Sequence, residues 1–482
     1  MELEPVIGLE VHVQLGTASK IFCGSSASFG AEPNQHIDPL TFGLPGSLPV
    51  LNKRVVEYAI MVGLAMNCEI RTYNRFARKH YFYPDLPKGY QISQYEEPIC
   101  ERGQIKINVE GIERVIGVTR VHMEEDAGKN IHDTRTEASL VDLNRAGVPL
   151  LEIVSDPDIR SSAEAGAYLK TIRQLVRFLG VSDGNMEEGS LRCDANISLR
   201  PEGEMKFGTR TEIKNLNSFK FVERALEYEI ARQMSLIKSG KTIIQETLLF
   251  DSVTGTTHSM RSKEESSDYR YFPDPDLPPL IVEEAWIGEI KGRMPKLPAE
   301  RKAELVEVYG LTEYDADVLT VERSYSEYFE EVFNVCNNAK LACSWVTSEL
   351  FGALKKVGID IAKSPVSAKH LGELVRLIDA ETISGKMAKT VFEEMFTTSK
   401  PPTVIIEEKG LRQITGDDDI LEIVQKAFAA NQKQLSSYLG GDDRIHPFFV
   451  GQVMKLSNGS ANPKKVNEII LREVAKLRGK AA

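Results

Sequence analysis

Two side chains near the N-terminus have the types and the spacing for chemistry: Glu10 and His12, in the segment Val6–Leu15. Apolar and polar residues alternate along this segment, which predicts a strand with one buried face and one polar face. Glu10 and His12 share the polar face and are near enough to bind one ion. By itself this pattern is most typical of a half-exposed sheet, so a functional site requires more carboxylates at the same place.

A carboxylate inside an apolar run is a stronger signal. Glu152 lies in Leu150-Leu-Glu-Ile-Val154, a run closed by the turn Ser155-Asp-Pro157. Such a run predicts a strand covered on both faces, where an unpaired carboxylate costs several kcal/mol. We therefore expect Glu152 to be paired or bound to a metal ion.

Further acids follow on other predicted strands of the same half of the chain. Glu124 and Glu125 end one strand, and their segment fits a metal-binding turn or an ordinary acidic turn equally well. Asp194 lies on the polar row of another alternating segment, and Glu212 lies on the strand after it. If these strands share one sheet, its polar face is too acidic to be stable without cations.

These residue types favour metal-assisted phosphoryl transfer. Carboxylate oxygens with one imidazole suit Mg²⁺ or Mn²⁺ better than zinc. Nearby polar and basic side chains suit the phosphates of a nucleotide: Lys79, Arg192, Asn196 and Lys214. The nucleotide site would not be a P-loop, because Gly240-Lys-Thr242 follows a predicted helix and Ser235 stands in place of the first glycine.

The elements that must position these residues predict an α+β fold with three domains. Residues 1–292 form the predicted catalytic domain, a mixed, mostly antiparallel sheet with helices. Residues 293–404 have helical spacing and predict an all-helical domain, and residues 405–482 predict a small helical tail domain. Within the first domain, the basic and aromatic segment Arg75–Asp85 is expected to be a loop, either solvated or anion-binding.

Composition excludes several classes of protein. The net charge is −11, so binding to a nucleic acid would require a local basic surface. No apolar run approaches the roughly 20 residues of a membrane helix, and the N-terminal residues lack the features of a signal or transit peptide. We expect a cytoplasmic protein with no membrane association. The six cysteines contain no Cys-x-x-Cys pair, which argues against a disulfide framework and an intact zinc site.

Longer motifs make the chain recognisable, and together they resemble the B-subunit family of aspartyl/glutamyl-tRNA(Asn/Gln) amidotransferases over almost the whole chain. The motifs are Ile7-Gly-Leu-Glu-Val-His-Val13, Lys79-His-Tyr-Phe-Tyr-Pro-Asp85, His122-Met-Glu-Glu-Asp-Ala-Gly-Lys129, Leu140-Val-Asp-Leu-Asn-Arg145, Glu188-Gly-Ser-Leu-Arg-Cys-Asp-Ala-Asn196, Lys214-Asn-Leu-Asn-Ser218 and Asp268-Tyr-Arg-Tyr-Phe-Pro-Asp274. Their length makes this resemblance specific.

The resemblance implies an ATP-dependent, kinase-like site that phosphorylates the side-chain carboxylate of misacylated Asp-tRNA(Asn) or Glu-tRNA(Gln). Ammonia released from glutamine by the glutaminase (A) subunit then displaces the phosphate, giving Asn-tRNA or Gln-tRNA. The implied partners are the amidotransferase A and C subunits in a heterotrimer, and the implied cofactors are ATP and Mg²⁺. The family's Mg²⁺ ligands would fall on Glu10, His12, Glu124 or Glu125, and Glu152, with Asp194 and Glu212 near a second ion; the predicted catalytic residues are Glu10, His12, Glu125 and Glu152.

One departure from the family concerns zinc. Many members carry four cysteines in the loop after the first strand, and these cysteines bind zinc. This chain keeps only Cys23, whereas Ser25, Asp38 and Thr41 occupy the other three positions. Zinc is therefore not expected, and the loop should be held by packing.

The tail domain supplies the local basic surface. Its last predicted helix, beginning at Pro463, carries mostly basic charges. A solvated helix face would explain any one of these residues, but the resemblance implies that the tail contacts the tRNA body through phosphates and hydroxyls. The predicted RNA-binding residues are Lys455, Lys464, Lys465 and Arg472. Truncation after Pro401 is expected to weaken tRNA binding and to leave the ATP site intact.

Three alternative functions are disfavoured by the sequence. An RNA-presenting scaffold with a vestigial metal site is the weaker hypothesis because the family's acids and His12 are all present. The archaeal sister protein carries a large insert before its helical region, and no such insert is visible here. A free-standing glutaminase is disfavoured because this sequence contains no recognisable nucleophile pattern. Glutamine must therefore be hydrolysed on another chain.

Overall fold

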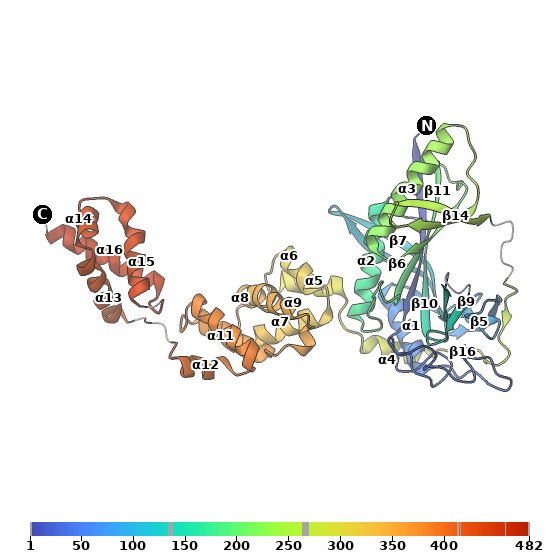
Figure 1. Ribbon diagram of the computed structural model, residues 1–482, viewed down its shortest axis with the longest axis horizontal. Helices are drawn as coiled ribbons and strands as arrows, with labels where there is room; N and C mark the ends of the chain where they lie inside the picture. The colour runs from blue at the N-terminus through green and yellow to red at the C-terminus, as the bar shows by residue number, and fades with distance from the viewer. Residues whose placement is uncertain are drawn as a thin grey trace. The chain divides into compact units, whose positions relative to one another are not determined.

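The computed structural model describes residues 2–133, 138–262, 269–411, 414, 416–457 and 459–480 (Figure 1). Asp268, the first residue of one motif, lies outside the described residues. The chain divides into two compact units, Met1–Pro298 and Ala299–Ala482. This division lies close to the predicted boundary between residues 292 and 293.

The first unit is built on a twelve-stranded sheet. Its strands are β1 (Leu3–Gln14), β2 (Glu69–Ile70), β4 (Phe76–His80), β5 (Tyr90–Gln94), β6 (Cys100–Val109), β7 (Ile112–Glu125), β10 (Pro149–Ser155), β11 (Leu191–Pro201), β12 (Thr211–Leu216), β13 (Glu246–Asp251), β14 (Thr256–Ser262) and β15 (Phe272–Pro273). Among the described pairings only β12 with β13 is parallel. The prediction of a mixed, mostly antiparallel sheet is confirmed.

Strand β1 lies in the middle of this sheet, between β10 and β11. Its buried residues alternate with half-buried ones, as the sequence predicted, and Ile7, Leu9, Val11 and Val13 belong to the hydrophobic core. Three helices supply the other side of this core: α1 (Lys53–Ala65), α2 (Ser162–Phe178) and α3 (Phe219–Lys238). Helices α2 and α3 run together along the sheet (Figure 1). The opposite face of β1 is therefore left to polar side chains.

The prediction of a loop over Arg75–Asp85 is wrong for its first half, which forms strand β4 between β5 and β15. The basic residues of this strand favoured a solvated loop because their acidic partners are distant in sequence and could not be recognised there. Arg78 Nε donates to Asp274 Oδ2 at 3.0 Å, and its guanidinium lies over the ring of Tyr90. Tertiary contacts thus override the local preference.

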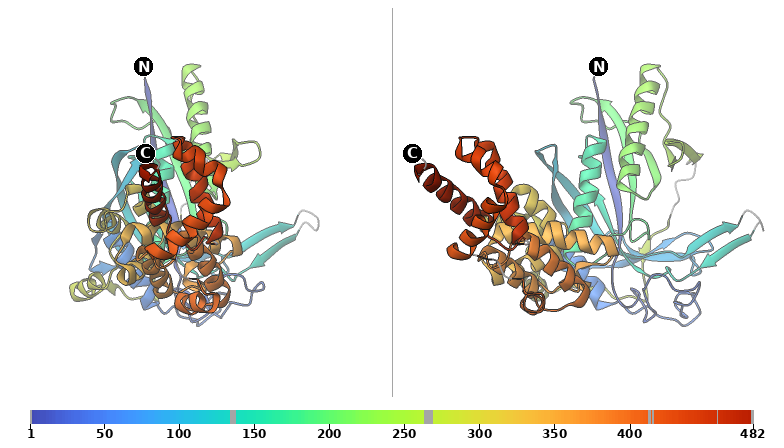
Figure 2. Two further views of the ribbon diagram at one scale, coloured as in Figure 1. Left: turned by 90° about the vertical axis from the view of Figure 1, so that its left-hand side faces the viewer. Right: turned by 60° about the vertical axis from the view of Figure 1, so that its left-hand side comes forward.

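Two short pairs of strands lie outside the main sheet. Strand β3 (Tyr73–Asn74) pairs with β16 (Leu280–Ile281), and helix α4 (Glu284–Gly292) follows. Strands β8 (Lys129–Asp133) and β9 (Ala138–Asp142) form a hairpin that projects from the body of the first unit (Figure 2).

The second unit contains only helices among its described elements, which confirms the predicted helical region. They are α5 (Pro298–Glu307), α6 (Glu313–Leu319), α7 (Arg323–Cys336), α8 (Ala339–Ser344), a π-helical turn (Trp345–Leu350), α9 (Phe351–Val357), a 3₁₀ turn (Ile361–Lys363), α10 (Ala368–Asp379), α11 (Gly385–Thr398), α12 (Pro402–Lys409), α13 (Asp417–Ala430), α14 (Gln432–Leu439), a 3₁₀ turn (Asp443–Ile445), α15 (His446–Leu456) and α16 (Pro463–Lys480). No helix in the described part of the chain has the length and apolar character needed to cross a membrane.

Two separate hydrophobic cores lie within this second unit. The first takes side chains from α5 to α12, and the second takes side chains from α13 to α16. The predicted boundary at residues 404 and 405 falls inside α12, and Ile405 and Ile406 pack into the first core. The change from one core to the next comes later, between Leu411 and Ile414.

Candidate metal centre and nucleotide site

Strand pairing brings the predicted ligands together on the polar face of the sheet. His12 on β1 lies opposite Glu152 on β10, and Glu10 lies opposite Asp194 on β11. Beyond these strands, β7 pairs with β10 and contributes Glu124, while β12 pairs with β11 and contributes Glu212. Directly paired residues in antiparallel strands point to the same side, so these acids converge.

The first group consists of His12, Glu124 and Glu152. Each offers one ligand atom, and these atoms all lie within 4.8 Å of one another. His12 Nε2 is 3.3 Å from Glu152 Oε2, and both glutamates are buried. One imidazole with two carboxylates is a suitable donor set for Mg²⁺ or Mn²⁺.

The second group consists of Glu10, Asp194 and Glu212, whose ligand atoms also lie within 4.8 Å of one another. Here a cation is already present: Lys214 Nζ is 2.7 Å from Asp194 Oδ2 and 3.0 Å from Glu212 Oε1. Asn196 Nδ2 donates to Glu10 Oε1 at 2.9 Å. The sequence placed Glu10 with His12; the structure places it in this neighbouring group instead.

His122 adjoins the first group and was not singled out from the sequence. Its Nε2 is 3.8 Å from Glu124 Oε2 and 3.9 Å from Glu152 Oε2. The side chain is buried, and its Nδ1 has no hydrogen-bond partner among the described residues. The signal was available, because His122 has the same strand parity as Glu124 and stands between apolar Val121 and Met123.

Glu125 is turned away from both groups. Its Oε1 accepts a hydrogen bond from the backbone N–H of Ile92 at 2.9 Å and forms an ion pair with Lys88. Successive strand residues point to opposite faces, so Glu124 and Glu125 cannot both reach the same ion. The structure therefore brings Glu124, and not Glu125, into the first group.

Burial and neighbouring charges set the protonation of the two groups. Burial raises the pKa of Glu152, but His122 and His12 outweigh it and hold that pKa well below its usual value. Burial lowers the pKa of His12, but the hydrogen bond and charge of Glu152 raise it above its usual value. In the second group, burial and then the charge of Glu152 raise the pKa of Glu10.

The predicted phosphate-binding residues border the same face. Burial lowers the pKa of Lys79, but the charges of Glu124 and other anionic neighbours outweigh it and leave the pKa raised, so the ammonium is charged beside the first group. Arg192 lies opposite His12 and donates to Asp126 Oδ2 at 2.8 Å. Asn196 and Lys214 belong to the second group, as described above.

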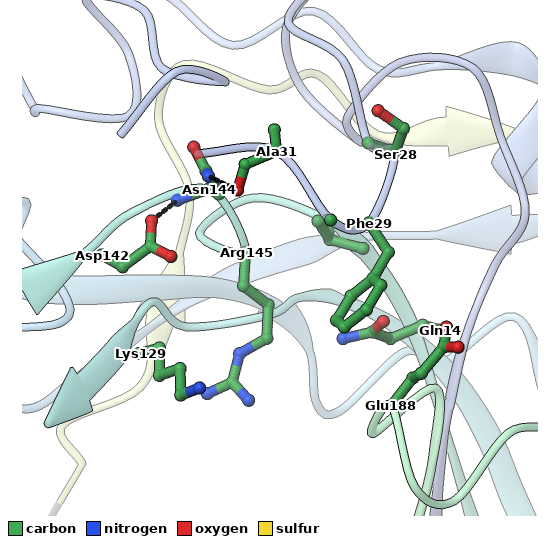
Figure 3. A pocket seen from close by; sticks show the side chains of 12 residues that line it. Gln14, Ser28, Phe29, Ala31, Lys129, Asp142, Asn144, Arg145 and Glu188 are labelled. Atoms are coloured by element: carbon green, nitrogen blue, oxygen red, sulfur yellow. Dashed lines mark hydrogen bonds between the residues drawn. The ribbon is translucent and has the colours of Figure 1, made fainter. Parts of the chain in front are cut away.

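Two pockets lie along β1, on either side of the metal-binding groups. One, of about 260 Å³, contains Gly8, Glu10, Asn196, Phe207 and Arg210 in its walls. The other, of about 330 Å³, contains Gln14 and residues from the hairpin and the loop after β1 (Figure 3). The two acidic groups thus lie between two cavities.

Comparisons with known proteins show which family the chain resembles. The GatB/GatE catalytic domain matches residues 5–288, and the GatB domain matches residues 327–474. The B subunit of the aspartyl/glutamyl-tRNA(Asn/Gln) amidotransferase of Thermodesulfovibrio yellowstonii is 55% identical over 98% of this chain and 99% of its own length. The protein of the same name from Syntrophotalea carbinolica is 54% identical over 98% of each chain.

The chain belongs to the amidotransferase B-subunit family. The matched catalytic domain includes every member of both acidic groups. The matched GatB domain includes all four predicted RNA-binding residues.

Within the matched GatB domain, most of the predicted RNA-binding cations contact acids. Lys465 and Arg472 both pair with Asp417, at 3.1 and 3.4 Å. Lys464 Nζ is 3.4 Å from Glu381 Oε1. Lys455, at the end of α15, is exposed and has no acidic partner among the described residues.

The loop after β1, for which the sequence predicts no zinc, is anchored by hydrogen bonds. Cys23 belongs to neither group of metal-binding residues found in the described part of the chain, and burial raises its pKa to about 11. Lys20 is fully buried, and its Nζ donates to the carbonyl oxygen of His36 at 2.5 Å. Asn34 donates to the Val141 carbonyl at 2.9 Å, and a network of hydrogen bonds thus holds the loop.

Proposed function

We propose that this chain is the component of a tRNA-dependent amidotransferase that activates a carboxylate with ATP. The substrate is misacylated Asp-tRNA(Asn) or Glu-tRNA(Gln), as in the names of its relatives. The observation that carries this proposal is the pair of acidic groups between two pockets. A nucleotide and an aminoacyl ester could approach such a centre from opposite ends.

The donors fit hard divalent cations. His12, Glu124 and Glu152 would hold one Mg²⁺, and Glu10, Asp194 and Glu212 would hold a second ion. Buried His122, with an unpartnered ring nitrogen among the described residues, supports the first of these sites. Magnesium there would supply charge neutralisation for the phosphates.

The 260 Å³ pocket beside the second group is the proposed site for the nucleoside of ATP. Val154, which lies opposite Glu10, gives it an apolar side chain, and Phe207 offers an aromatic face. Arg210 lies in the same wall, where its guanidinium can contact a phosphate. A cavity that is mainly apolar with a few polar groups is typical of a ligand site.

The reaction then has two steps. An oxygen of the side-chain carboxylate attacks the γ-phosphorus of ATP, and the bond from that phosphorus to ADP breaks, which gives an acyl phosphate. Ammonia then attacks the acyl carbon, the carbon–oxygen bond to phosphate breaks, and the amide remains. Lys79, charged and beside the first group, would stabilise the negative charge that develops on the transferred phosphoryl group.

The partners follow from the chemistry. Glutamine is the amide donor, so a glutaminase, the A component, must deliver ammonia, and the C component completes the proposed heterotrimer. We place the complex in the cytoplasm, where aminoacyl-tRNA is consumed. The α13–α16 core is the proposed contact with the tRNA body.

The decisive experiment measures ATP cleavage by the complex with Asp-tRNA(Asn) and glutamine. We compare wild type with His12→Ala and Glu152→Ala, and use His258→Ala and Glu113→Ala, on the exposed parts of β14 and β7, as matched controls. Loss of tRNA-dependent ATP cleavage in the first pair only, with glutaminase activity retained, supports the proposal. Full activity in all four variants shows that the acidic face is structural and that the chain only presents RNA.

Metal analysis tests the cofactor assignment separately. We expect no stoichiometric zinc in the purified protein, because the cysteine set is incomplete and Lys20 already anchors the loop. Finding one zinc per chain by elemental analysis would contradict this. Activity should instead depend on added Mg²⁺ or Mn²⁺ and be lost with a chelator.

A further inference from the structure

The residues of the 330 Å³ pocket beyond Gln14 have no assigned contacts with either substrate in the proposed function. Its walls come from three parts of the chain: strand β1 with the loop after it, the hairpin β8–β9 with the turn that follows, and the segment before β11. The side chains that define it are Gln14, Phe29, Lys129, Asn144, Arg145 and Glu188 (Figure 3).

The position of this pocket relates it to the metal-binding groups. Gly8, Glu10, His12 and Gln14 follow one another on the same face of β1, spaced by about 7 Å per pair of residues. Gly8 lines the proposed nucleotide pocket, and Gln14 lines the 330 Å³ pocket. Each pocket is therefore next to one acidic group, and the two are on opposite sides of the centre.

Asp126 links the pocket residues Gln14 and Arg145 to Arg192, which lies opposite His12 in the sheet. Its Oδ2 accepts from Gln14 Nε2 at 2.7 Å and from Arg192 at 2.8 Å. Arg145 Nε is 3.7 Å from the same carboxylate, and Arg145 also donates to the carbonyl oxygens of Ala127 and Gly128, at 2.8 and 2.7 Å. Gln14 and Arg145 are thus held in place before any ligand arrives.

The opposite walls differ in chemistry. Lys129 and Arg145 point into the pocket from one wall, and the ring of Phe29 lies across from them beside Gln14 (Figure 3). Phe29 is 74% exposed, so its ring is accessible to a ligand. Lys129 is also exposed and has no acidic partner among the described residues. Two cations facing an aromatic ring suit a phosphate attached to a base.

We propose that this pocket binds the 3′-terminal nucleotide of the aminoacyl-tRNA. Phe29 stacks on the terminal base, and Lys129 and Arg145 contact the phosphate that precedes it. The amino acid, esterified to the terminal ribose, then extends past Gln14 toward His12 and Glu152. This inference rests on the proposed function and assigns its second substrate to a place.

The alternative occupant of the pocket is ATP itself. A nucleoside triphosphate bound here would lie next to the first group, and the 260 Å³ pocket would then receive the acceptor end. Phe29, Lys129 and Glu188 are all exposed, so the pocket opens to solvent. An open pocket favours the tRNA over ATP, because the rest of the tRNA must continue outward from its bound terminal nucleotide. The same experiment separates the two arrangements.

The test uses the complete amidotransferase complex and steady-state kinetics of ATP cleavage and amide formation. The variants are Phe29→Ala and Lys129→Ala; Phe207→Ala alters the other pocket, and Lys106→Ala, on exposed β6, is the matched lysine control. The substrates are Asp-tRNA(Asn) and the aspartyl ester of its terminal CCA trinucleotide. KM is measured for each of these and for ATP.

We expect Phe29→Ala and Lys129→Ala to raise KM for Asp-tRNA by about tenfold, with KM for ATP unchanged. The trinucleotide should show the same factor, because the contacts are to its last nucleotide. Phe207→Ala should raise KM for ATP only, and Lys106→Ala should change neither. KM for Asp-tRNA should also be measured at several salt concentrations. In Lys129→Ala the slope of log KM against log salt should be smaller by about one, because one phosphate contact is lost.

Two results would overturn the inference while leaving the proposed function in place. In one, wild type cleaves ATP in response to Asp-tRNA and both pocket variants keep wild-type KM values. In the other, Phe29→Ala and Lys129→Ala raise KM for ATP. ATP would then occupy the 330 Å³ pocket, and the acceptor end of the tRNA would occupy the 260 Å³ pocket. Absence of tRNA-dependent ATP cleavage in wild type would instead reject the proposed function itself.

Discussion

His122 shows how a single residue acquires a role from the strands around it. It lies beside Glu152 in the pairing of β7 with β10, and its neighbour two residues on is Glu124. Its position within 4 Å of both carboxylates is suitable for a direct ligand of the proposed metal ion or for a group that orients its ligands.

Replacing His122 should therefore weaken metal binding. We expect His122→Ala to lower the affinity for Mn²⁺ about 10–100-fold, since removing a supporting partner has effects of that size. Titration calorimetry with Mn²⁺ measures the change, and activity should recover in part at high metal concentration. His258→Ala, on exposed β14, is the control. An unchanged Mn²⁺ affinity in His122→Ala would show that this imidazole only fills the core.

Glu10 permits a prediction about stability without metal. Burial and then the charges of Glu152, Asp194 and Glu212 raise the pKa of Glu10 above its usual 4.5. Because the folded state favours the protonated form, ionised Glu10 destabilises the metal-free fold increasingly as the pH rises above 4.5. The isosteric change Glu10→Gln removes this cost and keeps the oxygen that accepts from Asn196.

Thermal unfolding in a chelator should therefore show Glu10→Gln melting a few degrees above wild type near neutral pH, with no difference in acid. Added Mg²⁺ should reverse the order, because it stabilises wild type more. If Glu10→Gln melts below wild type in the chelator at neutral pH, the carboxylate is favourable in the empty site and the expected repulsion is absent.

At the scale of elements, strand β4 depends on a distant segment. Arg78 on β4 pairs with Asp274 at 3.0 Å and with Asp276 at 2.6 Å. The Asp274 side chain is fully buried, so its charge has little access to water. Strand β15, which precedes Asp276, pairs with β4 at the same place. One arginine thus holds two segments together.

Arg78→Ala should destabilise the first unit by about 3 kcal/mol, because it leaves a buried carboxylate unpaired. Chemical denaturation followed by fluorescence measures this change. The double variant Arg78→Ala with Asp274→Asn should recover much of the loss. Equal loss in the single and double variants would show that packing of the arginine on Tyr90, and not charge, stabilises β4.

Much of this architecture follows from local patterns. The period of two made β1 predictable. Ser218, a residue type favoured at helix N-termini, accepts a hydrogen bond from Phe221 N–H at the start of α3. The acids were expected to converge because each lies on the polar face of its strand and the strands share one sheet. What remained hidden was register: the pairings of β1 with β10 and with β11 together separate His12 and Glu10 into two groups. Pairing between strands so far apart is set by the complete core and leaves no local signal.

At the scale of the whole molecule, the separate core of α13–α16 suggests that the tail can be removed cleanly. The cut must follow Leu411, because Ile405 and Ile406 on α12 belong to the preceding core. A cut after Pro401 would damage that core. The two truncations together therefore separate loss of the tail from loss of fold.

Truncation after Leu411 should weaken tRNA binding by about tenfold at moderate salt, since it removes the basic residues of α15 and α16. Fluorescence anisotropy with labelled tRNA measures the affinity, and Mn²⁺ binding at the first group should be unchanged. Lys455→Ala in the full chain should give a smaller loss of the same sign. Wild-type tRNA affinity after truncation would refute the assignment of the tail.

The central place of β1 also has a consequence for how this protein is made. It is synthesised before its partners β10 and β11, which end at residues 155 and 201. At ribosomal rates of about 5–20 residues per second, its apolar row waits roughly 10–40 s for both neighbours. During that time an unpaired strand is open to aggregation. The nascent chain thus needs protection at this strand, and the two acidic groups are assembled only when the sheet closes.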